Sequence, residues 1–322
     1  MTANRKADWL GNAPTEWRAL WRSLPDKALL LVLLAAWVAL FHFLGSANFG
    51  WVKNPSMFAW LQFVYTTSAD DQYCLFIPLV VLGLCLWKSK ELTAVEKRIW
   101  WPALGAVAAG LLLHVLGYMV QQIRISVVAF VVGMYGVMGI LWGKQWLKAI
   151  LFPYFLLLFC VPLGSLADGI TLPLRIVASR ITAVVSSLIG IQIVQDGTQI
   201  FSAIHGYRYE VAAACSGWNS LIAFVGLTTI YGFVFFPFGW KRAVIILAGP
   251  PMALACNVLR LTCIVIAAES FGQTAGNFVH EKLGMLFYIP GFIALILLGN
   301  WLERRQTSRA PRAQLEVEAK PA

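Results

Sequence analysis

The chain has 322 residues, of which 59% are hydrophobic and 12% are charged. A composition this apolar excludes an ordinary soluble domain, and several uncharged runs of about 20 residues predict a polytopic membrane protein. The formal net charge of +10 does not indicate a nucleic-acid-binding protein. The basic residues cluster in loops on one side of the expected spans, which is the usual charge bias of membrane proteins.

The chain begins with a polar and basic segment, residues 1–27, whose Trp9, Trp17 and Trp21 suit an interfacial helix in a cytoplasmic tail. The first apolar run is long and ends without a small-residue cleavage pattern, so we expect no cleaved signal peptide. The transmembrane domain is expected over residues 28–301, and residues 302–322 read as a disordered cytoplasmic tail. About eight transmembrane helices are expected, at residues 28–45, 72–87, 99–119, 125–142, 149–166, 216–236, 243–268 and 280–301.

The interval between the fifth and sixth spans, residues 167–214, predicts a small extracytoplasmic cap. Its first half is amphipathic and predicts a helix that lies in the membrane interface. Its second half predicts short strands in a β-hairpin-like arrangement, with turns at Asp196-Gly197 and His205-Gly206. The apolar stripe of the helix is Leu174, Val177, Ile181, Val184, Val185 and Leu188, and its polar stripe is Arg175, Ser179, Thr182 and Ser186. The expected fold is therefore an all-α polytopic membrane protein with one interfacial helix and a small β cap.

The distribution of basic residues orients these spans. With eight spans, 18 of the 25 Lys and Arg residues fall on the side that holds both termini, and 6 fall on the other side. The positive-inside rule then places both termini in the cytoplasm. Arg260 is the one remaining basic residue and lies inside the seventh span.

Three reactive side chains are expected to converge on the outer leaflet. Cys215 begins the sixth span, His280 begins the eighth, and Arg260 lies about two turns below the outer end of the seventh. A thiol is a strong nucleophile near neutral pH, and an imidazole beside it serves as general base and then acid. His205 in the cap is a rival for that role.

Arg260 is costly within a span, at about 2.5–3.5 kcal/mol on insertion scales, so it is expected to face a cavity or a partner. It would stabilise an oxyanion or the thiolate, and snorkelling to the headgroups is the alternative. Asn257 lies on the same helical face and is suited to orient it. Glu210 is expected to pair with Arg208 or Arg260, and Ser216 to support the nucleophile.

The other cysteines lie in apolar runs and are expected to be small core residues. Their spacing matches neither a zinc site nor a secreted disulfide framework, so neither a metal nor a cofactor is expected. A disulfide between Cys74 and Cys215 stays open. These cysteines are Cys74, Cys85, Cys160, Cys256 and Cys263.

Three sequence blocks resemble the signature of the exosortase/archaeosortase family. They are Glu210-Val-Ala-Ala-Ala-Cys215-Ser-Gly, Pro251-Met-Ala-Leu-Ala-Cys-Asn257-Val-Leu-Arg260 and His280-Glu-Lys-Leu-Gly284. The resemblance covers roughly residues 30 to 300. It implies a membrane cysteine protease or transpeptidase in which Cys215, Arg260 and His280 act together.

The resemblance also implies the substrates and the setting of the reaction. The substrates would be secreted proteins whose C-terminal sorting signal has a motif of the Pro-Glu-Pro type (PEP-CTERM), a transmembrane helix and a basic tail. The secreted protein would be transferred from a Cys215 thioester to water or to an unknown acceptor on a membrane lipid or glycan, at a bacterial inner membrane and in association with exopolysaccharide production. The sequence predicts no additional soluble domain of the kind that some family members carry after the last span.

Two other functions fit parts of the sequence. A membrane transporter would use a buried arginine for an anionic solute and spans interrupted by Gly and Pro. It also requires a polar path to the cytoplasmic side, for which the inner halves of the spans supply no charged residues. The second alternative is a membrane subunit of an exopolysaccharide export system. Such a subunit would not require an arginine inside a span, so it leaves Arg260 unexplained.

Overall fold

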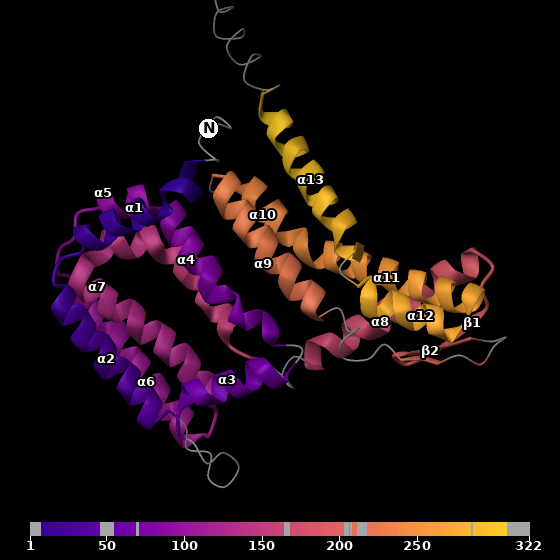
Figure 1. The fold of residues 1–322 in the computed structure, drawn as a ribbon, viewed down its shortest axis with the longest axis horizontal. Coiled ribbons are helices and arrows are strands. Elements are labelled where there is room, and N and C mark those ends of the chain that lie inside the picture. The colour runs from indigo at the N-terminus through magenta and orange to yellow at the C-terminus, as the bar shows by residue number, and fades with distance from the viewer. Residues whose placement is uncertain are drawn as a thin grey trace, which may run out of the picture. The chain divides into compact units, whose positions relative to one another are not determined.

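The computed structural model describes residues 8–45, 55–68, 71–163, 168–202, 206, 208–210, 218–237, 239–284 and 286–307. The chain divides into two compact units, Met1–Gly164 and Ser165–Ala322 (Figure 1). Both units are mostly helical and the second contains a small sheet, which confirms the predicted class.

The first unit contains seven α-helices and three short 3₁₀ helices (η) among its described residues. They are α1 (Asp8–Ser23), α2 (Lys27–Phe43), α3 (Met57–Thr67), η2 (Gln72–Leu75), α4 (Ile77–Trp87), α5 (Ser89–Ala94), η3 (Trp101–Ala103), α6 (Leu104–Met119), α7 (Ile123–Phe155) and η4 (Leu156–Cys160).

The helix labelled α7 reverses its direction at Gly143, where φ is +88° and ψ is 175°. Tyr154 donates a hydrogen bond to the carbonyl of Val131 at 2.8 Å, and Tyr135 donates one to the carbonyl of Leu147 at 2.9 Å. A straight helix would separate Val131 from Tyr154 by about 35 Å, at 1.5 Å per residue. Residues 123–142 and 144–155 are therefore two antiparallel helices, where the sequence predicted the fourth and fifth spans.

Gly143 is the residue that permits this reversal. Its positive φ strains any L-residue, and a Cβ there would overlap the carbonyl oxygen of Arg98. Gly143→Ala is therefore expected to destabilise the protein by about 1–3 kcal/mol. Gly105→Ala is the matched control, because a Cβ at this position of α6 meets nothing within 4 Å. Thermal unfolding in detergent should show a lower midpoint for Gly143→Ala alone, and equal midpoints for the two variants would contradict the turn's role.

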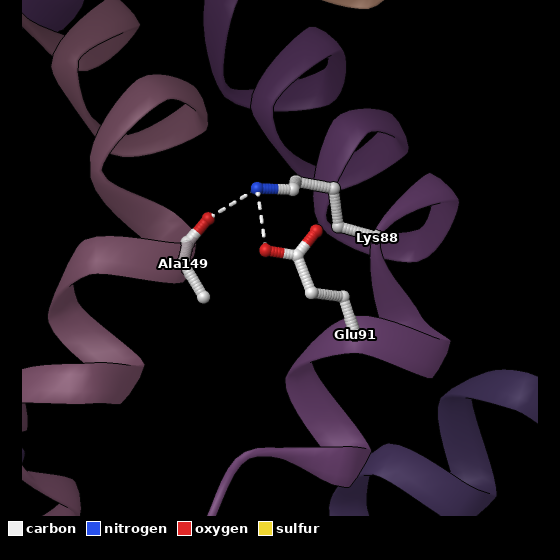
Figure 2. Close-up of polar contacts among 3 residues, drawn as sticks. All are labelled: Lys88, Glu91 and Ala149. Carbon is white, nitrogen blue, oxygen red and sulfur yellow. Dashed lines mark hydrogen bonds and ion pairs between the residues drawn. The ribbon is translucent and has the colours of Figure 1, made fainter.

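Two sets of contacts show which elements lie at each end of the helices of the first unit. At one end, Lys88 donates to the carbonyl of Ala149 at 2.6 Å and pairs with Glu91 at 3.2 Å (Figure 2). At the other end, Arg124 donates to the carbonyl of Pro162 at 2.7 Å. The segments between these ends run alternately up and down, as α2, η2 with α4, α6 and the two halves of α7. This alternation is what successive membrane spans require.

Three helices lie where the sequence predicted no span. The N-terminal tail forms α1, as expected for an interfacial helix, and its residues Pro14–Ser23 make an angle of 96° with α2. The connections after the first and second predicted spans also contain helices, α3 and α5, which the sequence did not predict. Ser56 caps α3 by accepting a hydrogen bond from the amide of Ala59 at 3.3 Å, a cap that Ser prefers.

The second unit contains a three-stranded antiparallel sheet and six α-helices among its described residues. Its elements are α8 (Asp168–Leu188), β1 (Ile193–Asp196), β2 (Gln199–Ser202), β3 (Arg208–Glu210), α9 (Trp218–Phe235), α10 (Trp240–Leu247), α11 (Gly249–Phe271), α12 (Gln273–Lys282), η7 (Leu286–Tyr288) and α13 (Ile289–Thr307).

The small sheet is confirmed where it was predicted, and its extracytoplasmic position stays a prediction. β1 and β2 form a hairpin with Val194 opposite Phe201, and β3 pairs with β2 on its other edge. The turn passes through Gly197 at φ +59°, the left-handed conformation that Asp-Gly turns favour.

The helix α8 has the predicted amphipathic pattern, and its polar face is turned inward. Ser179, Thr182 and Ser186 are fully buried, whereas Leu188 is 81% exposed. The exposed apolar face suits contact with lipid. Residues Thr171–Leu188 also meet the length and hydropathy of a membrane span, so the interfacial placement stays a prediction.

Three helices of the second unit form a bundle whose register the contacts define. Phe224 of α9 packs against Phe292 of α13, with ring centroids 5.3 Å apart, and one heptad later Tyr231 packs against Gly299. The helices α9 and α13 are therefore parallel.

The same face of α9 fixes the direction of the third helix. Phe224 packs against Cys256 of α11, and Thr228 lies against Gly249, which is earlier in α11. The helix α9 is therefore antiparallel to α11. This register places the first turn of α9 level with Arg260.

By length and composition, five helices of the described residues are able to cross a membrane, or six if the bent pair α1–α2 counts as one span. Two further apolar helices, Gln72–Trp87 and Ser220–Phe235, are shorter. The chain is therefore a multi-pass membrane protein, and the predicted number of eight spans is not reached by this measure. This count by length and composition treats residues Ile123–Cys160 as one helix, although the chain reverses at Gly143.

Two predicted boundaries near the C-terminus are wrong. His280 does not begin the eighth span: it lies in the last turn of the separate helix α12, and α13 begins at Ile289. The polar composition of α12 explains why it is not part of a span. The helix α13 also continues to Thr307, beyond the predicted end at Trp301.

Candidate active site

The candidate site is built on a helical hairpin formed by α11 and α12. Gly272, at φ +91°, reverses the chain between the two helices, a conformation that favours glycine. Gly276 lies so close to α11 that a Cβ there would approach Ala268 to 2.7 Å and the carbonyl of Ile264 to 3.3 Å. The small residue lets the two helices approach closely, which carries the end of α12 back to the level of Arg260.

Arg260 and His280 meet at the end of this hairpin. The Nη2 of Arg260 donates a hydrogen bond to the backbone carbonyl of His280 at 3.1 Å. That carbonyl belongs to the last turn of α12, where helical carbonyls have no intrahelical partner and a cation is favoured by the helix dipole. Arg260 thus caps α12, which fixes the backbone of His280 beside the guanidinium.

The guanidinium keeps further donors for another group. The Nε of Arg260 is buried and has no hydrogen-bond partner among the residues that the structure describes. Gly284 lies against the same group: a Cβ there would stand 3.3 Å from Nη2. A guanidinium has five N–H donors in a planar fork, which suits binding of an oxyanion.

The surroundings of His280 favour its neutral form. Partial burial and the positive charge of Arg260 lower the pKa of His280 below its usual value, while Glu281 opposes this shift. Both of the lowering causes disfavour the imidazolium. A neutral imidazole near pH 7 has a nitrogen free to accept a proton, which is the state that a general base requires.

The start of α9 lies at the same level. Ser220, in the first turn of α9, donates a hydrogen bond to the hydroxyl of Tyr288 at 2.9 Å. Tyr288 follows Gly284 closely in the chain and packs against Phe224. The segment after His280 is therefore tied to the helix that begins just after Cys215.

A small hydrophobic core supports the hairpin. The last turns of α11 pack against α8 and the sheet, so the site lies on a fixed scaffold rather than on a loop. The buried members of this core are Ala178, Ile200, Leu261, Ile264, Val265 and Ala268.

The structure brings together part of the predicted site. Arg260 and His280 are in contact, and Asn257 is buried at 3% exposure one turn before Arg260. Glu210 ends β3, but its side chain lies outside the described part of the structure. Cys215, Ser216 and His205 also lie outside the described residues, and the possible pairing of Cys74 with Cys215 is therefore untested.

Ser220, Tyr288 and Gly284 are positioning residues that the sequence did not predict. Gly284 ends one of the three sequence blocks and Ser220 lies three residues after another, so proximity to those blocks was the available signal. Tyr288 gave none, because its contact with Ser220 joins residues 68 positions apart. Within the described residues, no group of three His, Cys, Asp or Glu side chains is arranged to hold a metal ion.

Comparison with known families supports the resemblance seen in the sequence. The family model described as Transmembrane exosortase (Exosortase_EpsH) matches residues 60–298. The chain belongs to the exosortase family. The matched residues include Arg260, His280 and the block around Cys215. No curated protein and no solved structure matches the chain. Exosortases are in general membrane cysteine transpeptidases.

Proposed function

We propose that this exosortase-family protein cleaves the C-terminal sorting signal of secreted proteins at the outer face of the inner membrane. Cys215 is the nucleophile, His280 the general base and acid, and Arg260 the oxyanion-stabilising residue. The observation that carries the proposal is the contact of Arg260 with His280, level with the start of α9 and therefore close in the chain to Cys215.

The proposed topology has eight spans. They are α2, the short helix of residues Gln72–Trp87, α6, the two halves of α7, α9, α10 with α11, and α13. The antiparallel halves of α7 and the alternating ends of the first unit support this count. Both termini are then cytoplasmic, and the cap and α12 lie outside, in agreement with the charge bias.

The length of the seventh span supports a site at the membrane surface. Residues Trp240–Phe271 form 32 residues of nearly continuous helix. This corresponds to about 48 Å, against about 30 Å of hydrocarbon. The last turns of α11 pack against the cap rather than against other spans. We therefore place the outer membrane boundary near Arg260, where the desolvation cost of its charge is smaller than at the centre of a span.

The reaction begins with proton transfer from the thiol of Cys215 to the neutral imidazole of His280. The thiolate attacks the scissile carbonyl of the sorting signal, and the guanidinium of Arg260 stabilises the oxyanion of the tetrahedral intermediate. Collapse breaks the C–N bond, and the imidazolium of His280 gives its proton to the leaving amine. The signal helix stays in the bilayer, and the secreted protein remains on Cys215 as a thioester.

The second half of the reaction reverses these proton transfers. A water molecule, or a hydroxyl or amine of a lipid or glycan, gives a proton to His280 and attacks the thioester. The Cys215 sulfur leaves and recovers its proton from His280. We assign Asn257 and Glu210 to positioning rather than to chemistry, and exopolysaccharide production is the proposed setting.

The experiment uses the full chain in lipid vesicles with a reporter that ends in a Pro-Glu-Pro motif, an apolar helix and a basic tail. Cleavage near the motif supports the function, and persistence of the intact reporter contradicts it. In a plot of kcat/KM against pH, we expect the midpoint of the acidic limb to lie below the usual pKa of histidine. The reason is that burial and Arg260 lower the pKa of His280.

A charge variant tests whether that limb belongs to His280. Glu281 raises the pKa of His280, so Glu281→Gln should lower it further and move the acidic limb to lower pH. Glu96→Gln, an exposed carboxylate of the first unit, is the control and should leave the limb in place. An unchanged limb in Glu281→Gln would assign the titration to another group.

A further inference from the structure

Two thiols from distant parts of the chain meet at one end of the first unit. The Sγ of Cys74, in η2, donates to the carbonyl of Phe159 at 3.4 Å. The Sγ of Cys160, in η4, lies 3.9 Å from the carbonyl of Cys74. Each thiol therefore contacts the backbone of the turn that carries the other.

The backbones of both turns are held by further hydrogen bonds. The hydroxyl of Tyr65 donates to the carbonyl of Cys160, and the amide of Cys74 donates to the carbonyl of Asp71 at 3.0 Å. A disulfide requires Cα atoms about 4.4–6.8 Å apart. Reciprocal sulfur-to-carbonyl contacts between two anchored turns hold the two cysteines side by side, as such a bond requires.

The two cysteines differ in accessibility. Cys74 has no exposed surface, whereas Cys160 is partly exposed. Cys160 is thus the thiol that an external oxidant reaches, and Cys74 is the thiol that lies beside it. This is the arrangement of an attacking cysteine and a resolving cysteine.

We propose that Cys74 and Cys160 form a structural disulfide. The proposal rests on the proposed topology, which puts this end of the first unit outside the cytoplasm, where disulfides form and persist. The oxidant is the disulfide of an extracytoplasmic thiol oxidoreductase. The Cys160 thiolate attacks one of its sulfurs and gives a mixed disulfide, with loss of one oxidoreductase thiolate.

The thiolate of Cys74 then attacks the Cys160 sulfur and releases the second oxidoreductase thiolate. The two electrons and two protons of the cysteines thus pass to the oxidoreductase dithiol. Cys74 has no exposed surface, so this second attack takes place within the protein and does not require the oxidoreductase to reach Cys74. The bond joins η2, at the start of α4, to η4, at the end of α7, across 85 intervening residues. A Cys74 oxidised in this way cannot also pair with Cys215, so the nucleophile stays a free thiol.

The test is made on the full chain, purified from membranes without reductant. Free thiols are blocked with N-ethylmaleimide in denaturant, and the chain is digested and analysed by mass spectrometry. The expected result is a linked peptide pair that contains Cys74 and Cys160 and disappears on reduction. Cys85 and Cys263 serve as controls and should carry the label. Label on both Cys74 and Cys160, or a link from Cys74 to Cys215, would overturn the proposal.

Single variants distinguish a disulfide from simple packing. Cys74→Ser and Cys160→Ser should lower the thermal midpoint by similar amounts, and the double variant should lose no more than either, because each change removes the same bond. A loss confined to the buried Cys74 would show packing alone. The linked peptide is read without any activity assay. If the linked pair is found in a chain that does not cleave the reporter, the proposed function is refuted and the disulfide proposal stands.

Discussion

Replacement of Cys215 by alanine is expected to lower cleavage of the sorting signal by at least about 10³-fold, because no other group of the proposed site can form the acyl-enzyme. Full-length precursor should accumulate in the membrane. The measurement is the rate of reporter cleavage in vesicles, with hydroxylamine used to trap the thioester. Wild type should yield the hydroxamate of the cleaved protein, and Cys215→Ala should yield none.

Two variants separate nucleophilic chemistry from an effect on folding. Cys215→Ser keeps the size of the side chain but has a much less acidic nucleophile, so it should retain the fold and lose most of the rate. Cys263→Ala alters a cysteine of α11 that has no proposed role and should cleave at a normal rate. Normal processing in Cys215→Ala cells would show that the nucleophile is assigned wrongly.

The parts of the fold that the sequence predicted are those with a local signal. Long apolar runs predicted the helices of both units, and the Asp196-Gly197 turn predicted the hairpin of β1 and β2. The apolar and polar stripes of α8 were also predicted from the sequence. The burial of the polar stripe was not predicted, because burial of Ser179 and Thr182 depends on packing against elements far along the chain.

The error at α12 has a physical cause. The sequence predicted no separate helix between the seventh and eighth spans, because a short polar helix has no apolar period of its own. It is stabilised by close packing of Gly276 on α11, a contact between segments that only the reversal at Gly272 brings together. The sequence therefore predicted that His280 and Arg260 share one side of the membrane. It could not predict that Arg260 binds the backbone of His280, because that contact depends on the register of the hairpin.

Arg260 connects the structure of the site to its chemistry, and its substitution has the second large expected effect. Arg260→Gln should lower kcat by about 10²–10³-fold with a smaller change in KM, as expected for a group that stabilises an oxyanion. It should also raise the pKa of His280, since the positive charge that lowers it is removed. The acidic limb of kcat/KM should therefore move to higher pH, opposite to the shift in Glu281→Gln.

Arg260→Lys separates charge from geometry. It keeps the cation beside His280, so the acidic limb should stay in place. A lysine ammonium cannot cap α12 and present a planar fork to the oxyanion at once, so kcat should still fall by about tenfold. The control is Arg180→Gln, an exposed arginine of α8, which should match wild type. If Arg260 only reached toward lipid headgroups, Arg260→Lys would match wild type as well. If it only held α12 in place, the loss of rate in each variant would follow the loss of thermal stability.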